Sequence, residues 1–545
     1  MPTPDSPSPK SKSRVPESPS PSPVRRFGYD RFSMATSRRT FLRGAAASAL
    51  AWPLGLSAQD TGTLSPRLFQ HGVASGDPLA DRVILWTRVT SPPSRSAIGP
   101  IDVSWQICDD EKLTRVVARG QAPAAPERDF TVKVDATGLQ PGRHYYYAFE
   151  AGGQRSPVGR TRTLPANGVA RLRIAVASCS NYPAGYFNAY RGIAKRADLD
   201  LVLHLGDYIY EFADGVYGDS KSIGRVPLPA GEAVTLADYR LRYAIYRSDP
   251  DLQEAHRLHP FVVVWDDHEI ANDAWSGGAG NHSAAQGDYG TRLAGAYRAY
   301  VEWLPIREAP GADMRLYRSF RLGGLGDLIM LDTRGPRDRQ LTTGTAAELA
   351  DPGRTMLGAT QEAWFFDQLR TSKREGASWR LIGQQILFAS LSPTGLPFSP
   401  DMWAGYPAAR TRVLDFLAAE RMADTAMLTG DLHSSWAIEL APNPWAGAAS
   451  PAARPIAVEL VTPALSSPPL FTDQTLRSRA PLLRAAAPHV KYLEGDGNGY
   501  ILLDVTRERL QAEYYVVATV RDHVDRESRA ARYVCERGSS RLMPA

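Results

Sequence analysis

The sequence predicts an α/β protein preceded by a β-sandwich, and three observations support this fold class. Between residues 65 and 165, short alternating strands recur about every ten residues and are separated by Gly, Pro and Asp turns. From residue 170 to 525, apolar strands alternate with helical patterns, which is typical of α/β layers. Four of these later strands end in side chains of the types that bind metals.

Composition is ordinary for a globular protein and excludes some classes of function. The chain has 545 residues, enough for two or more domains, with 43% hydrophobic and 22% charged residues. Residues 1–44 contain nine Lys and Arg against three acids, so this stretch accounts for the net charge of +5 and the rest is near neutral. No nucleic-acid-binding patch is therefore expected. Cys108, Cys179 and Cys535 are too few for a disulfide framework and allow one bridge at most.

The N-terminal stretch predicts export. Residues 37–43 read SRRTFLR and are followed by a moderately apolar run with small residues near Ala58, which indicates a twin-arginine signal over residues 34–58. The twin-arginine machinery is then a partner, and the mature protein is periplasmic or secreted. The run is too short to span a membrane, so no transmembrane segment is expected in the mature chain. The alternative is an arginine pair before an Ala-rich helix. Residues 1–33 are Pro/Ser-rich and predicted disordered, and Met34 is a second candidate start.

The first folded region, residues 65–165, predicts a small β-sandwich of fibronectin or immunoglobulin type. It shows no catalytic grouping, and we expect His71 and Asp77 to be structural. The predicted strands cover residues 82–88, 101–107, 130–134 and 145–149.

The second region, residues 170–525, predicts two stacked sheets with helices. Its predicted strands cover residues 171–177, 201–205, 261–265, 327–331, 379–385, 426–428, 458–461 and 499–515. Its predicted helices cover residues 185–195, 239–256, 289–303, 361–372 and 412–421. Asp249 and Pro250 interrupt the second of these helices.

The chemistry lies where four strands end. Residues 201–211 read LVLHLGDYIYE, a buried strand that opens into a loop through Gly-Asp, and open α/β sheets place their sites at that end of their strands. Carboxylate and phenolate oxygens suit ferric iron and calcium, whereas thiolate and imidazole suit transition metals, and one shared Asp could bridge two ions. The alternative is a set of unrelated Asp-containing turns. The four endings carry Cys179, Asp207 with Tyr210, Asp267 with His268, and Asp431 with His433.

Ten short motifs occur in order along the chain: His71–Pro78, Ile84–Arg88, Ala177–Ser180, Gly206–Glu211, Trp265–Glu269, Leu331–Arg334, Gln361–Trp364, Asp401–Tyr406, Thr429–Trp436 and Thr462–Pro463. This ordered set resembles the PhoD-like (alkaline phosphatase D) family of metallophosphoesterases. The resemblance implies that the sandwich is followed by a calcineurin-like four-layer α/β/β/α domain and a C-terminal segment, residues 526–545. It also implies phosphomonoesterase or phosphodiesterase activity with Fe³⁺ and Ca²⁺ as cofactors.

The resemblance also assigns ligands. The residues that resemble the iron ligands are Cys179, Asp207, Tyr210 and His433. Asp207 would bridge to calcium, with Asp267 as a further ligand, Asp431 in or behind the ligand shell, and Asp401 and Asn272 as additional oxygen donors. The chain departs from the family at Ala404, where an acid is common, and this puts a second calcium site in doubt.

The predicted function is an exported alkaline phosphatase or phosphodiesterase that hydrolyses phosphate esters with a metal-activated hydroxide. His268 would donate a proton to the leaving group or contact the phosphoryl group, Arg292 and Arg334 would clamp phosphate oxygens, and His204 would be structural. The alternative is a non-catalytic exported β-sandwich protein that binds metal for structure or adhesion. Another class of ester is less favoured, because the chain has no Gly-x-Ser-x-Gly motif.

Overall fold

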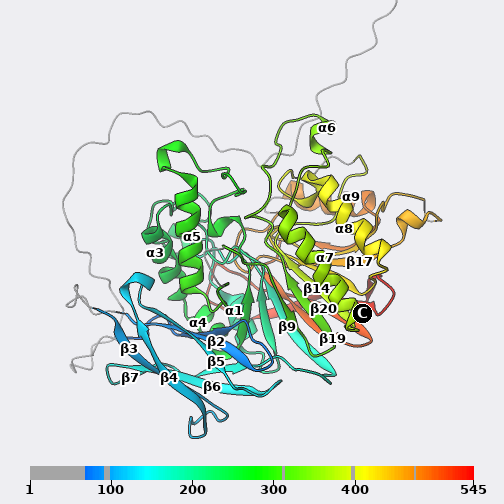
Figure 1. The fold of residues 1–545 in the computed structure, drawn as a ribbon. Coiled ribbons are helices and arrows are strands. Elements are labelled where there is room, and N and C mark those ends of the chain that lie inside the picture. Colours follow the sequence, from blue (N-terminus) through cyan, green and yellow to red (C-terminus); the bar gives the residue numbers. More distant parts are fainter. Residues whose placement is uncertain (1–67, 91–98, 310–313, 395–398, 448, 472–473) are drawn as a thin grey trace, which may run out of the picture. The chain divides into compact units, whose positions relative to one another are not determined.

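The computed structural model describes residues 68–545 except 91–98, 310–313, 395–398, 448 and 472–473 (Figure 1). All of them belong to one structural unit, Leu64–Ala545. The predicted disordered extension, residues 1–33, and the predicted export signal, residues 34–58, lie outside the described residues.

A ten-stranded sheet forms the first half of the α/β region. Its central strands β9, β10 and β11 are parallel, so their carboxyl ends meet at one edge. In spatial order the strands are β22 (Met543–Pro544), β21 (Glu527–Glu536), β20 (Arg509–Val517), β19 (Gly499–Thr506), β9 (Arg171–Ala177), β10 (Leu201–His204), β11 (Pro260–Val263), β1 (Val73–Gly76), β2 (Arg82–Arg88) and β5 (Thr131–Thr137).

A seven-stranded sheet forms the second half. Its strands β13, β14, β15 and β17 are parallel to one another. In spatial order the strands are β12 (Arg318–Arg321), β13 (Gly326–Met330), β14 (Trp379–Gln384), β15 (Thr425–Thr429), β17 (Ala457–Val461), β16 (Ser435–Leu440) and β18 (Val490–Glu494).

The apolar side chains define four layers, α/β/β/α. Leu172, Ile174 and Val176 of β9 pack between the two sheets, against Leu381 of β14 among others. Ala175, on the opposite side of β9, packs toward the first helical layer, because side chains alternate along a strand. The first layer holds α1 (Asn188–Ala194), α3 (Leu236–Arg247), α4 (Pro250–Leu258) and α5 (Tyr289–Trp303). The outer layer on the second sheet holds α7 (Gly358–Arg374), α8 (Pro407–Ala419) and α9 (Gln474–Ala486). Two short helices, α2 (Ser220–Ile223) and α6 (Ala346–Leu349), lie in connecting loops.

The predicted β-sandwich is present, and it shares a sheet with the α/β region. Its own five-stranded sheet packs on β1, β2 and β5 through a core that includes Val103, Tyr147 and Leu85. Since β1 pairs with β11, the ten-stranded sheet runs across the boundary predicted near residues 165–170. Asp77 pairs with Arg318 of the second region at 2.7 Å. The strands of the five-stranded sheet are β4 (Val116–Ala124), β3 (Ile101–Cys108), β6 (His144–Ala151), β7 (Gln154–Arg155) and β8 (Gly159–Arg162).

Most differences from the predicted elements lie at breaks and edges. The predicted interruption of residues 239–256 is confirmed, because Asp249 accepts hydrogen bonds from the N–H groups of Asp251 and Leu252 and caps a new helix that begins at Pro250. The strand predicted over residues 499–515 is the hairpin of β19 and β20. The segment 526–545 adds β21 and β22 to the ten-stranded sheet.

Two further expectations can be compared with the structure. Cys108, Cys179 and Cys535 are all buried and free, so the possible bridge does not form. In the part of the chain that the structure describes, no helix combines the length and apolar character that crossing a membrane requires.

Candidate metal centre

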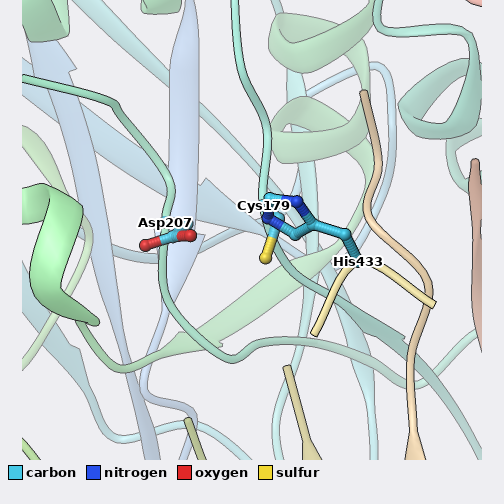
Figure 2. A group of neighbouring side chains, drawn as sticks. All are labelled: Cys179, Asp207 and His433. Atoms are coloured by element: carbon cyan, nitrogen blue, oxygen red, sulfur yellow. The ribbon is translucent and has the colours of Figure 1, made fainter. Parts of the chain in front are cut away.

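Three overlapping groups of side chains meet at the carboxyl edge of the two sheets. The first group is Cys179, Asp207 and His433, which we call the thiolate cluster (Figure 2). The second is Asp207, Asp267 and His268, and the third, which we call the carboxylate cluster, is Asp266, Asp267 and Asp431. Within each group the candidate ligand atoms lie within 4.8 Å of one another. The structure therefore brings together the four strand endings that the sequence singled out, and adds Asp266.

Parallel pairing explains why residues so distant in sequence meet. Cys179 follows β9 and Asp207 follows β10, and the loops are tied where the Cys179 N–H donates to the Gly206 carbonyl at 3.1 Å. Gly206 has a φ of +105°, and a Cβ there would lie 2.4 Å from Cβ of Asp266. Only glycine allows the loops after β10 and β11 to approach this closely.

Four of the clustered residues have left-handed backbone conformations. The φ angles are +63° at Cys179, +56° at Asp207, +59° at Asp431 and +50° at His433. Such conformations persist where the surrounding structure enforces them, and they concentrate at functional sites.

Glu269 is one of the residues that hold these backbone conformations in place. Its buried carboxylate accepts hydrogen bonds from the N–H groups of Asp207 at 3.0 Å and of Asp266 at 2.6 Å, and a further one from Tyr208. One side chain thus fixes the backbone of both loops. Burial raises the pKa of Glu269 to about 8.

Tyr210 joins the thiolate cluster through its hydroxyl. Tyr210 Oη donates to Asp207 Oδ2 at 2.8 Å and lies 3.1 Å from His433 Nε2. The other ring nitrogen of His433, Nδ1, lies 3.0 Å from both the Pro468 carbonyl and Tyr217 Oη. His433 Nε2 is therefore directed at Tyr210 and the cluster, since its Nδ1 is held from behind.

Electrostatics around the thiolate cluster favour neutral ligands until a cation arrives. Burial, followed by the nearby charge of Asp207, raises the pKa of the Cys179 thiol well above its ordinary value. Burial likewise raises the pKa of the Asp207 carboxyl and of the Tyr210 phenol. Burial lowers the pKa of His433 to about 4, so this imidazole is neutral and able to ligate.

The carboxylate cluster surrounds a buried arginine. Arg334 pairs with Asp266, and its Nη1 donates to Asp401 Oδ2 at 2.8 Å. Its Nη2 lies 3.5 Å from Asp267 Oδ1 and 3.7 Å from Asp431 Oδ1, and this nitrogen is buried without a hydrogen-bond partner. Arg334 is therefore placed at the cluster with one donor group unsatisfied.

Asp401 forms ion pairs with two arginines. Both its oxygens bond to Arg334, and it also pairs with Arg337. Although burial by itself raises the pKa of Asp401, the two guanidinium groups outweigh burial and lower it to about 2. Among the described residues, the three groups do not include Asp401, although the sequence proposed it as a calcium ligand.

His268 stands at the end of a hydrogen-bonded chain. Its Nδ1 lies 2.8 Å from Glu211 Oε2, and the other Glu211 oxygen accepts from Asn281 Nδ2 at 2.8 Å. Asn281 also contacts Glu232 at 3.2 Å, and Glu232 accepts from Arg292 at 2.8 Å. Arg292, predicted to clamp phosphate, thus has no described contact with the clustered residues themselves and is connected to them through Glu232 and Asn281, and through Tyr239 and the Ala233 carbonyl.

Neighbouring carboxylates favour the protonated form of His268. Burial lowers its pKa, but the carboxylates of Asp267, Glu211 and Asp207 outweigh burial and raise it well above the ordinary value.

His204, expected to be structural, is fully buried and stacks on Tyr190.

Sequence reasoning missed several residues of this centre. Asp266 and Glu269 flank the predicted Asp267-His268 pair, and an apolar strand ending in four polar residues was a usable signal for both. Glu211 closes the opening motif, so its proximity to Asp207 was also a signal. No signal pointed to Tyr217, or to Ser467, whose hydroxyl lies 2.7 Å from Tyr210 Oη, because both enter the site from loops without a recognisable pattern.

The fold and the clustered side chains define a class, an α/β/β/α protein with a candidate metal centre, and comparison with known families identifies which family it is. The model of the PhoD-like phosphatase family matches residues 174–514, and that of its N-terminal domain matches residues 56–165. The chain belongs to the PhoD-like phosphatase family and is a phosphoric ester hydrolase.

Individual relatives agree with this assignment. The chain is 37% identical to alkaline phosphatase D from Bacillus subtilis (strain 168), over 93% of this chain and 88% of that protein. It superposes on a solved structure titled "Structure of PhoD" with a TM-score of 0.79 and 36% identity, over 87% of this chain and 92% of the other. The predicted fold class and family are confirmed, and hydrolysis is favoured over the non-catalytic alternative.

Proposed function

We propose that the protein is an exported alkaline phosphatase or phosphodiesterase whose centre holds iron and calcium. The observation that carries the proposal is the sharing of Asp207, whose carboxylate belongs to the thiolate cluster and also to the group with Asp267. A carboxylate shared in this way can bridge two ions, as in two-metal hydrolytic sites.

The residues fit such ions. Asp207 Oδ1, Asp266 Oδ2 and Asp267 Oδ1 are buried oxygens without hydrogen-bond partners among the described residues. Unsatisfied buried carboxylate oxygens are costly unless a cation or a proton meets them. Thiolate, phenolate and imidazole around Asp207 suit iron, and the carboxylate cluster suits calcium.

Each side chain has a definite task in this proposal. When bound, the two ions neutralise the phosphate ester and activate the attacking water. His268 uses Nδ1 to hold Glu211, so its Nε2 is the ring nitrogen that carries a proton toward the leaving alkoxide. Arg334 directs its unsatisfied Nη2 toward the carboxylate cluster, where it donates to a phosphoryl oxygen. Arg292 supports His268 through Glu232, Asn281 and Glu211.

The proposal is tested by metal analysis combined with an activity panel. We expect iron and calcium in the purified protein, a visible charge-transfer band from Tyr210, and hydrolysis of p-nitrophenyl phosphate and bis-p-nitrophenyl phosphate that chelation removes. A colourless, iron-free and fully active protein would overturn the iron assignment. Activity that survives complete metal removal would overturn the two-ion centre.

Export is a separate part of the proposal and rests on the leader sequence. The twin-arginine pathway carries folded proteins, so the centre can be filled before translocation. Fusing residues 34–64 to a reporter tests the signal. The reporter should reach the periplasm or medium, and replacing Arg38 and Arg39 by Lys should retain it in the cytoplasm; export of the doubly substituted fusion would exclude this route.

A further inference from the structure

Two serine hydroxyls lie against two candidate ligand atoms of the thiolate cluster, Cys179 Sγ and Tyr210 Oη. Ser178 Oγ is 3.2 Å from Cys179 Sγ, and Ser467 Oγ is 2.7 Å from Tyr210 Oη. Both serines are fully buried. They come from different parts of the chain, Ser178 from the end of β9 and Ser467 from the loop after β17.

Ser467 is held in place by its own backbone. Its N–H donates to the Cys179 carbonyl at 3.2 Å, and its carbonyl accepts from Asn498 Nδ2 at 2.7 Å. Its hydroxyl has two neighbours, the Cys179 carbonyl at 3.0 Å and Tyr210 Oη at 2.7 Å. A hydroxyl carries one proton, so it can donate to one of these at a time.

The Ser467 hydroxyl can donate its proton either to the Cys179 carbonyl or to Tyr210 Oη. Which of the two receives it when a metal is bound depends on the other groups around Tyr210 Oη. Oη lies within hydrogen-bond distance of Asp207, His433 and Ser467. Asp207 and His433 are themselves proposed ligands, and the atoms that now contact Tyr210 Oη, Asp207 Oδ2 and His433 Nε2, would then face the ion. Ser467 is therefore the one of these three residues that can donate a hydrogen bond to the phenolate.

Ser178 is confined in a similar way. Its side chain lies against Gly430, where an added Cβ would approach Ser178 Oγ to 3.0 Å. With a neutral thiol, Cys179 Sγ donates to Ser178 Oγ. With a thiolate the hydroxyl reverses and donates to sulfur, because serine is both donor and acceptor whereas a thiolate only accepts.

We propose that Ser178 and Ser467 are positioning residues that stabilise the thiolate of Cys179 and the phenolate of Tyr210 by hydrogen bonds made when the metal binds. This inference rests on the proposed function, in that it takes both side chains as ligands. Hydrogen bonds to ligand atoms lower the energy of their lone pairs and fix their direction. Removing either bond loosens the metal, and removing that of Ser467 moves the phenolate charge-transfer band to longer wavelength.

The test compares Ser467→Ala and Ser178→Ala with Ser466→Ala. Ser466 is buried in the same loop but donates to the Asn181 carbonyl at 3.0 Å and has no described contact with a ligand atom. We expect Ser467→Ala and Ser178→Ala to lose metal to a chelator about tenfold faster than the parent, the scale typical of outer-sphere partners. The Ser467→Ala band should move to longer wavelength, while Ser466→Ala matches the parent in both measurements.

A double-mutant cycle separates this role from a general effect on folding. In a Tyr210→Phe background the phenolate is gone, so Ser467→Ala should change metal loss no further. Equal behaviour of the Ser467 and Ser466 variants, or an undiminished Ser467 effect beside Phe at position 210, would overturn the Ser467 assignment. A parent protein without a visible band would instead contradict iron in the proposed function, and metal loss alone would then decide the role of the serines.

Discussion

The two clusters of the centre differ in whether a positively charged side chain of the protein lies among their acidic groups. The thiolate cluster has three groups that lose protons to become ligands, Cys179, Asp207 and Tyr210, and the ion pairs of the described residues bring no Arg or Lys to it. The carboxylate cluster surrounds Arg334, whose charge already balances part of it. An ion bound in the thiolate cluster would therefore supply its charge balance, whereas the carboxylate cluster has the internal cation Arg334 with or without a bound ion.

This difference predicts two kinds of metal site within one centre. An ion in the thiolate cluster replaces protons in a dry environment and should be retained tightly. An ion in the carboxylate cluster approaches a guanidinium group and should exchange more readily, since like charges repel in a buried site. Asp207 belongs to the thiolate cluster and also to the group with Asp267 and His268, so its replacement should disturb both proposed ion sites at once.

Replacing Asp207 by Asn should have the largest effect. The amide cannot bridge two cations, so kcat should fall more than about 1,000-fold, the scale seen when a central catalytic group is removed. Metal analysis should show both ions depleted. Asp367→Asn, at an exposed position on α7, is the matched control and should leave both measurements unchanged. Turnover near the parent level in the Asp207 variant would contradict the shared-carboxylate centre.

His268→Gln should have the next largest effect and should depend on the leaving group. Loss of a general acid costs about 100- to 10,000-fold, and the loss should be greatest for an alkyl phosphate, whose alkoxide needs the proton. It should be smallest for p-nitrophenyl phosphate. Glu211→Gln, which weakens the 2.8 Å contact to His268 Nδ1, should show the same pattern at lower amplitude. An equal loss for both substrates would rule out proton donation.

Chelation should separate the two clusters. A calcium-selective chelator should lower activity about 100-fold while the visible band persists, because the ion beside Arg334 exchanges first. Added Ca²⁺ should restore activity. Simultaneous loss of band and activity at one rate would show that the clusters are not distinct in affinity.

Acidification should weaken the thiolate cluster more steeply than the carboxylate cluster. Burial raises the pKa of Cys179, Asp207 and Tyr210, so each holds its proton over a wider pH range and must release it when metal binds. Metal affinity therefore falls as pH falls, with a slope set by the protons released. In the carboxylate cluster, burial raises the pKa of Asp266 to about 6 despite Arg334 and raises the pKa of Asp431 well above its ordinary value, so two groups rather than three hold protons there. Metal titrations between pH 5 and 9 should give the steeper slope for iron.

Replacing Arg292 by Lys should have the smallest effect. Arg292 acts through Glu232, Asn281 and Glu211, so kcat should fall by less than about tenfold while KM stays constant. Arg298→Lys, on the same helix but paired with Glu302, is the matched control. A selective rise in KM for phosphate esters would instead indicate that Arg292 clamps substrate directly.

Local patterns in the sequence were sufficient to predict two stacked sheets with helices and the strand ends that carry the candidate ligands, whereas the four-layer order was implied by the family resemblance. The apolar side chains of residues 171–177 alternate between two cores, and the apolar run itself identifies a buried strand. Gly206-Asp207 directly follows another buried strand, and this turn sequence identifies where that strand opens into a loop. Strand endings therefore gave Cys179, Asp207, Asp267, Asp431 and His433 as candidates that the structure brings into the three groups.

Only the tertiary structure decided how these candidates are partnered. The pairing of β1 with β11, which continues one sheet through the sandwich, depends on residues 73–76 meeting residues 260–263, and no local pattern encodes that register. No local pattern predicts three further contacts either. Arg334 lies among four carboxylates, Asp401 forms ion pairs with two arginines, and the Ser467 hydroxyl lies beside Tyr210 Oη. Charge balance and hydrogen bonding depend on distances in space, so the sequence alone determined which groups are available, and folding determined what each of them contacts.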